Sequence, residues 1–193
     1  MHNIEPYYRW REEYAPEDDT RSPFYGRKYT EWKQIYNFVL HPMWDDFESE
    51  TLYLKVLMAD YEENYAIIEL IGEWNDAVEN DVHFLKRNVI EKMLDAGISR
   101  YILIMDNVLN FHGDGDDYYA EWAEECQDAF NGGWIAMVNT FDHVSTELHD
   151  TRLDPYVFFG QDYNDLNWRQ YPPKTVLKMV ELLINGGKRR FAF

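Results

Sequence analysis

Hydrophobic and polar residues follow two regular patterns from residue 52 onward. Short runs of apolar or β-branched residues are typical of buried strands. These runs span residues 52–59, 65–71, 101–105, 134–138 and 156–159. Longer segments place apolar residues about every 3.6 positions, the spacing of a helix with one buried face. These segments span residues 76–96, 117–130, 140–150 and 173–185.

The order of these elements predicts an α/β fold. Two strands separated by a short polar turn favour a hairpin, and the later strands alternate with helices. Because crossovers between strands of one sheet are right-handed, we expect the later strands to lie parallel. The expected fold is a mixed β-sheet with an N-terminal hairpin and helices packed on it. Asn75 or Asp76 is expected to cap the first helix, and Gly97, Gly132-Gly133 and Gly186-Gly187 to end helices.

Residues 1–51 lack this regularity. They contain four of the seven prolines and twelve aromatic residues. A disordered tail seldom carries so many aromatic rings. We therefore expect an arm that packs on the body of the molecule or on a partner subunit, using the large area that aromatic rings bury. Within the arm, residues 30–40 have the spacing of a short helix.

Three segments carry a resemblance to a known family. Residues 66–75 read Ala-Ile-Ile-Glu-Leu-Ile-Gly-Glu-Trp-Asn, similar to a family strand that ends in Gly-Glu-Leu-Asp. Asp106 follows a buried strand and Asp114 lies eight residues later, like the strand and loop aspartates of that family. Residues 134–138 are similar to its next strand. On these grounds residues 64–160 resemble a STAS domain, the fold of bacterial anti-sigma-factor antagonists and of regulatory tails of transporters.

The sequence patterns and the resemblance together predict three parts of the chain. Residues 1–51 are the aromatic-rich arm, and residues 52–160 are the STAS-like α/β domain. Residues 161–193 are expected to form a C-terminal helix and a basic tail packed on the same domain. From residue 169 to the end, the chain carries six basic residues and one acidic residue.

This sequence departs from the family at the position that matters most for regulation. Antagonists of this kind usually carry a phosphorylatable serine just after the loop aspartate, where this chain reads Asp114-Gly115-Asp116-Asp117. No Ser or Thr occurs between Tyr101 and Asn139. Carboxylates at a helix start supply part of the charge of a phosphate. The site therefore either imitates the phosphorylated state or has lost the switch, and the resemblance implies protein binding without catalysis.

Composition narrows the class of partner. The net charge is −18, from 36 acidic and 18 basic residues, which argues against nucleic acid and anionic membranes because both reward positive charge. A basic protein is the expected partner. No apolar run approaches the roughly 20 residues that cross a bilayer, and residues 1–30 lack the apolar core of a signal peptide. With one cysteine, Cys126, we expect a cytoplasmic protein without disulfides.

The densest group of polar residues is the expected partner-binding site. It lies in an expected polar loop over residues 106–117 and in the helix after it. Its members are Asp106, Asn110, His112, Asp114, Asp116, Asp117 and Glu121. In a twelve-residue calcium-loop register from Asn110, His112 falls on a ligand position, and imidazole is a poor ligand for hard cations. Helix capping by the aspartates explains the group better than a metal does, so no cofactor is expected.

Two alternatives to a non-enzymatic interaction module remain open. The first is a small enzyme that depends on a divalent metal or on paired carboxylates, with the same loop around its site. The second is a structural homodimer formed through the aromatic arm. The sequence contains no nucleophile, nucleotide-binding or HExxH motif.

Overall fold

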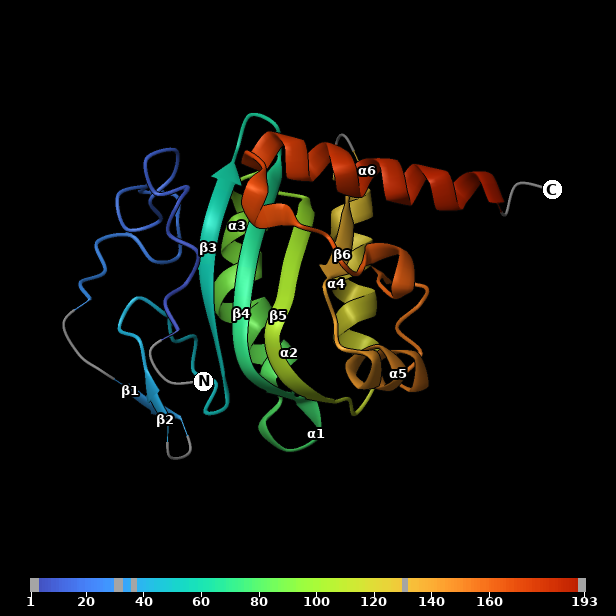
Figure 1. Ribbon diagram of the computed structural model, residues 1–193, viewed down its shortest axis with the longest axis horizontal. Coiled ribbons are helices and arrows are strands. Elements are labelled where there is room, and N and C mark those ends of the chain that lie inside the picture. The colour runs from blue at the N-terminus through green and yellow to red at the C-terminus, as the bar shows by residue number, and fades with distance from the viewer. Residues whose placement is uncertain (1–3, 30–32, 36–37, 130–131, 191–193) are drawn as a thin grey trace.

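Five strands form one sheet in the computed structural model, which describes residues 4–29, 33–35, 38–129 and 132–190. Their order across the sheet is β3-β4-β5-β6-β7 (Figure 1). The strands are β3 (Leu52–Asp60), β4 (Tyr65–Asn75), β5 (Arg100–His112), β6 (Trp134–Val138) and β7 (Val157–Phe158). β3 runs antiparallel to β4, and the other neighbours are parallel. The predicted mixed sheet with an N-terminal hairpin is confirmed.

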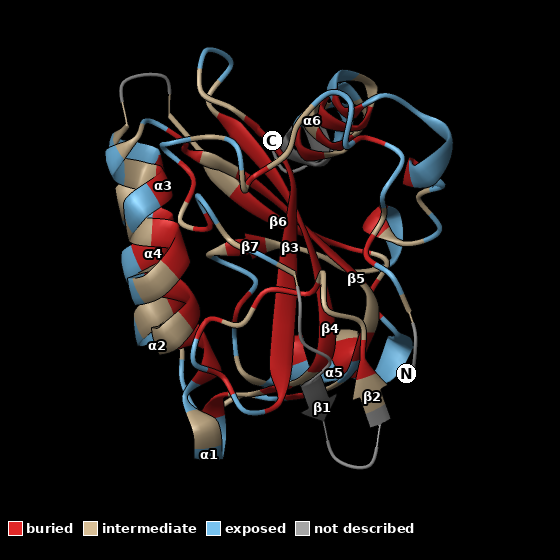
Figure 2. Cartoon of the chain, turned by 90° about the vertical axis from the view of Figure 1, so that its left-hand side faces the viewer, coloured by how far each residue is buried: buried red, intermediate tan, exposed pale blue. Residues whose placement is uncertain are grey.

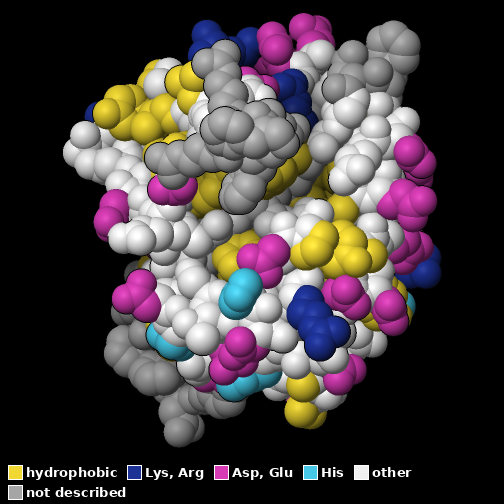
Figure 3. All heavy atoms as spheres, turned by 90° about the vertical axis from the view of Figure 1, so that its right-hand side faces the viewer, with side chains coloured by type: hydrophobic (Ala, Val, Ile, Leu, Met, Phe, Trp, Pro, Cys, Tyr) yellow, Lys and Arg dark blue, Asp and Glu magenta, His cyan; other side chains and the backbone are white. Residues whose placement is uncertain are grey.

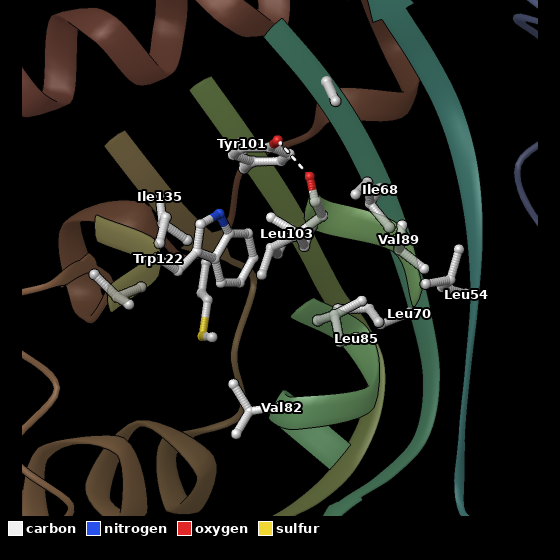
Figure 4. Packing of buried hydrophobic residues seen from close by; sticks show 14 of the residues in the cluster. Leu54, Ile68, Leu70, Val82, Leu85, Val89, Tyr101, Leu103, Trp122 and Ile135 are labelled. Atoms are coloured by element: carbon white, nitrogen blue, oxygen red, sulfur yellow. Dashed lines mark hydrogen bonds between the residues drawn. The ribbon is translucent and has the colours of Figure 1, made fainter. Parts of the chain in front are cut away.

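Helices cover one face of this sheet (Figures 1 and 2). They are α1 (Asp76–Glu79), α2 (Asp81–Leu85), the π-helical η1 (Lys86–Ile90), α3 (Glu91–Asp95), α4 (Asp117–Asp128) and α5 (Asp142–Asp150). Figure 4 shows how the two layers meet: Leu54, Ile68 and Leu103 of the strands face Leu85, Val89 and Trp122 of the helices. Burial of these side chains supplies most of the driving force that holds the layers together.

The opposite face is covered by C-terminal and N-terminal segments. The C-terminal ones are η2 (Gln161–Tyr163), η3 (Trp168–Gln170) and α6 (Pro173–Arg190). Ile67 and Ile102 of the sheet pack there with Val176 and Val180 of α6, and Trp10 of the arm joins the same cluster. The arm thus packs on the body of its own chain, one of its two expected positions. β1 (Lys33–Ile35) and β2 (Phe38–Leu40) form a separate two-stranded sheet.

The expected polar loop over residues 106–117 is wrong, because β5 continues to His112. The extension pairs with the end of β4, from Ile71↔Asn107 to Asn75↔His112. Val108 and Phe111 are buried in the helix-side core, and their burial stabilises an extended chain whose other residues, apart from the exposed Leu109, are polar.

Three expected helices also differ from the structure. The segment 76–96 is broken at Asn80, whose φ of 59° lies in the left-handed region that Asn tolerates. Asn75 caps the first piece, as expected, by accepting the Val78 N–H at 3.1 Å. α6 continues past Gly186-Gly187 to Arg190. Residues 33–35 and 38–40 are strands, and Trp32 and Tyr36 of the expected helix lie outside the described residues.

No helix in the described ranges combines the length and the apolar character that a membrane crossing requires.

Candidate functional site

The structure does not bring the seven expected site residues into one cluster. Asp106 belongs to the α6 side of the molecule, where the Trp168 indole N–H donates to its Oδ2 at 3.0 Å and Arg169 pairs with it. Asn110 lies within β5 and donates from Nδ2 to Glu73 Oε1 at 3.2 Å. His112 is exposed at the end of β5. Asp106 and Asn110 therefore serve contacts within the fold.

The remaining acidic residues lie where β5 turns into α4. Asp114 and Asp117 are exposed, and Asp116 is the residue before the helix. The expected capping is wrong for Asp116, whose side chain makes no cap hydrogen bond. Asp116 instead lies beside Tyr156, and its negative charge raises the pKa of that phenol. Figure 3 shows acidic side chains and histidines spread over this end of the molecule.

Gly113 lets this loop lie against α5. A Cβ at Gly113 would meet Thr151 Oγ1 at 2.2 Å, and that hydroxyl donates to the Glu147 carbonyl at 2.8 Å. The loop and the end of α5 border an open hollow with an acidic rim that includes Asp114, Glu147 and Asp150. The close approach places the loop carboxylates beside the C-terminal end of α5.

Helix α4 presents an acidic stripe to solvent. Its inner residues Tyr119, Trp122, Ala123 and Cys126 are buried, and Figure 2 shows the buried side of the helix turned toward the sheet. The exposed carboxylates at positions i, i+4, i+7 and i+11 form one face. They are Asp117, Glu121, Glu124 and Asp128, which we call the α4 stripe. α4 contains no Lys or Arg.

One buried cation organises part of this surface. Lys86 of η1 has a fully buried side chain, and its Nζ lies 3.3 Å from Glu121 Oε1, 3.0 Å from Glu125 Oε2 and 3.5 Å from Glu91 Oε1. Burial lowers the pKa of Lys86, but the hydrogen bonds and charges of Glu125 and Glu121 outweigh it, so the pKa lies above its usual value. Glu121, expected to contact a partner, is thus engaged by an internal cation.

The other stripe residues form no ion pair with a cation among the residues that the structure describes. Across the ranges that the structure describes, no ion pair involves Asp117, Glu124 or Asp128, and none involves Asp114 of the loop. Their charge is available to a partner. Sequence reasoning missed Lys86, Glu124 and Asp128 as site residues, although the helical spacing from Asp117 to Asp128 could have revealed the stripe.

A buried network holds α4 in place. Asp76 accepts the Tyr119 hydroxyl at 2.6 Å, the Trp74 indole N–H at 2.8 Å and the Val82 N–H at 2.8 Å. Burial raises the pKa of Asp76 to about 6. Because Tyr119 lies on α4 and Val82 on α2, this carboxylate joins both helices to the end of β4, and the stripe stands on a fixed support.

The described residues were compared with the requirements of a metal site and of a reactive thiol. Within the described part of the chain, no group of three His, Cys, Asp or Glu side chains is placed to hold a metal ion. Cys126 is buried on α4, and burial raises the pKa of its thiol to about 12, which disfavours the reactive thiolate.

No protein-family model matches the chain, and no curated protein matches it. Solved structures of similar arrangement include the anti-sigma factor antagonist SpoIIAA in its unphosphorylated form, with a TM-score of 0.46 and 12% identity over 66% of this chain and 96% of that one. A putative anti-sigma factor antagonist from Thermotoga maritima has a TM-score of 0.43 and 20% identity over 66% and 92%. The Bacillus cell fate determinant SpoIIAA in the phosphorylated form has a TM-score of 0.42 and 12% identity over 66% and 98%.

These structures belong to the class of fold that residues 64–160 resemble in sequence. The likeness concerns the arrangement of strands and helices, and no site residue of this chain is assigned from it.

Proposed function

We propose that this chain is a non-enzymatic, regulatory protein-interaction module of the cytoplasm. Its contact surface is the α4 stripe together with the loop carboxylates Asp114 and Asp116, and its partner presents a basic surface. The observation that carries the proposal is a row of exposed carboxylates on a firmly anchored helix without a basic residue. Such a surface attracts a positively charged partner and makes the association sensitive to salt.

The position of these carboxylates on α4 supports a role in binding. Glu124 and Asp128 lie toward the C-terminal end of the helix, where the dipole disfavours negative charge. The pairs Asp117/Glu121 and Glu124/Asp128 are like charges four residues apart, which repel each other. Carboxylates that cost stability in the free protein, as Glu124 and Asp128 do here, are the pattern expected where function opposes stability.

The sequence of the loop favours a surface whose negative charge does not depend on phosphorylation. The chain has carboxylates at residues 114, 116 and 117 and no Ser or Thr between Tyr101 and Asn139. We therefore propose that binding through this surface is constitutive and is not switched by phosphorylation at this place. Regulation would then come from the amount of partner or from another part of the molecule.

The test is partner capture with two sets of neutral variants. The stripe variant is Asp117→Asn, Glu124→Gln and Asp128→Asn, and the loop variant is Asp114→Asn, Asp116→Asn and Asp117→Asn. The matched control, Glu12→Gln, Glu13→Gln and Asp18→Asn, removes three exposed charges from the arm. We expect wild type and control to retain a common partner, and each site variant to bind it at least tenfold more weakly. Equal binding by all four proteins would show that the contact surface is elsewhere.

A further inference from the structure

Two opposite charges face each other across β3 and β4 without pairing. Lys55 and Glu69 are direct neighbours in the register of the two strands, so their side chains lie on the same face of the sheet within reach of each other. They are 5% and 1% exposed. In the part of the chain that the structure describes, they form no ion pair with each other; each one binds other groups instead.

The arm supplies many of these other partners. The Tyr7 N–H donates to Glu69 Oε2 at 2.7 Å. Lys55 Nζ lies 3.6 Å from Glu17 Oε2 and also contacts the Tyr29 hydroxyl. Residues 4–29, which we call the strap, therefore supply partners to both side chains.

Groups outside the strap hold the same two side chains. Arg169 donates to Glu69 Oε1 at 2.8 Å, and Asp45 Oδ2 lies 3.4 Å from Lys55 Nζ. These contacts do not require the strap, so both charges keep one partner each when it is removed. Because each charge keeps a partner, loss of its strap contact costs less free energy than leaving it buried and unpaired.

The strap itself has the features of a segment of low local stability. It contains no helix or strand, most of its residues are at least partly exposed, and a few buried side chains such as Trp10 and Phe24 anchor it. Between the strap and β3 lies a cavity of about 20 Å³, bordered by Tyr7, Tyr14, Glu17, Lys55 and Leu57, which is room for about one water molecule. Irregular segments with few buried apolar contacts open at lower free energy than the core.

We propose that the strap is a displaceable cover that leaves the sheet as a unit, and that Lys55 and Glu69 pair with each other when it does. The new pair compensates part of the lost contacts, so the sheet remains folded in the open state. Opening uncovers the strap side of β3 and β4, whereas the α4 stripe lies on the opposite side of the sheet. This inference does not depend on the proposed contact surface.

Opening of the strap is expected to depend on pH through Glu69. Burial raises the pKa of Glu69 to about 7, against the lowering effects of the Tyr7 N–H and of Arg169, while Asp106 adds to the increase. In the open state, exposure and the ammonium of Lys55 bring the pKa back toward its usual value. The closed state therefore takes up a proton, and closure is favoured as pH falls through about 7.

The first experiment is hydrogen exchange on the full chain, resolved by peptide. The strap amides that report opening are Tyr14 N–H, bonded to the Trp10 carbonyl, and Gly26 N–H, bonded to the Glu17 carbonyl. We expect them to exchange at least a hundredfold faster than the amides of β4 and β5, and opening to be more frequent at pH 8 than at pH 6 after correction for intrinsic rates. Equal protection of strap and sheet would overturn the proposal.

The second experiment tests the pairing of Lys55 with Glu69 separately from the opening of the strap. Glu69→Gln should reduce the pH dependence of opening and leave the part that comes from Asp45, which pairs with Arg27 of the strap and whose pKa burial raises to about 6. Asp154→Asn on the α5 side should leave the pH dependence unchanged. The charge swap Lys55→Glu with Glu69→Lys loses the closed-state contacts but keeps the open-state pair. We expect it to open the strap while retaining more sheet stability than the sum of its two single variants allows. Strictly additive losses, or the same pH dependence in Glu69→Gln as in wild type, would contradict the exchange of partners.

Discussion

At the scale of single residues, the buried ammonium of Lys86 connects the fold to the proposed surface. It is the internal cation of Glu121 and Glu125, and it lies between η1 and α4. A methionine of similar shape would leave these carboxylates without a partner. Because both glutamates are more than a third exposed, water compensates part of the loss.

We therefore expect Lys86→Met to lower the free energy of unfolding by about 1–2 kcal/mol, less than the 3–5 kcal/mol typical of a fully buried broken pair. Urea denaturation measures the change. The matched control is Lys92→Met, the same substitution at an exposed position nearby, which should change stability by less than about 0.5 kcal/mol. Equal effects of the two substitutions would show that the Lys86 contacts contribute nothing specific.

Asp76 gives the protein a pH dependence with a definite sign. Its folded pKa of about 6 lies above the ordinary 3.8, so the folded state binds the proton more tightly. The stabilisation from this group is complete below the ordinary pKa and is lost as pH rises toward 6. Compared with Asp76→Asn, wild type should lose up to about 3 kcal/mol of stability between these pH values.

Chemical denaturation at pH 4 and pH 6.5 measures this difference. Taking the difference between wild type and Asp76→Asn cancels Asp45 and Glu69, whose pKa values are also raised by burial. A Tyr119→Phe variant tests the same network independently, because it removes the donor at 2.6 Å. If wild type and Asp76→Asn show parallel pH profiles, Asp76 is not held as the structure implies.

At the scale of elements, α4 carries opposite effects of charge at its two ends. Replacing Glu124 and Asp128 by Gln and Asn removes charges that the dipole and each other disfavour, so stability should rise by about 0.3–1 kcal/mol. Asp117→Asn in the first turn should lower stability slightly, because negative charge suits that end. Thermal unfolding measures both, and a loss of stability in the double variant would mean that these residues make unrecognised internal contacts.

The elements that the sequence predicted are those with regular apolar spacing. The predicted ranges agree closely with β3, β4, β6 and α4. In these elements the burial of side chains sets both the spacing of apolar residues and the type of secondary structure. The extension of β5 escaped prediction because Asp106, Asn107 and Asn110 resemble a loop, and only pairing with β4 makes Val108 and Phe111 core residues. The pairing partner is β4, which is remote in sequence, so the residues of the extension alone do not indicate a strand.

The candidate site was predicted in part for the same reason. Asp114, Asp116 and Asp117 are near in sequence and stay near in space. Asp106 is separated from them because six further residues of strand carry the chain away from its contacts with Trp168 and Arg169. Lys86 was not foreseen because a buried lysine is rare, and its glutamate partners on α4 are more than thirty positions away.

At the scale of the whole molecule, the sheet separates two surfaces of different character. One side carries α4 and its exposed carboxylates on a support fixed by Asp76 and Lys86. The other side carries the strap, which contacts Lys55 through Glu17 and Glu69 through the Tyr7 N–H. We infer that the α4 stripe is a charged surface that is always exposed, whereas the strap is a cover that opens. Because they lie on opposite sides of the sheet, substitutions on one side can be tested without disturbing the other.

We propose above that the α4 stripe binds a basic protein. The most direct test measures the dissociation constant of the captured partner for wild type and for the stripe variant at low and moderate salt. We expect wild type to bind at least tenfold more tightly at low salt, and the difference to shrink as salt screens the charges. Equal affinities at both salt concentrations would contradict the claim.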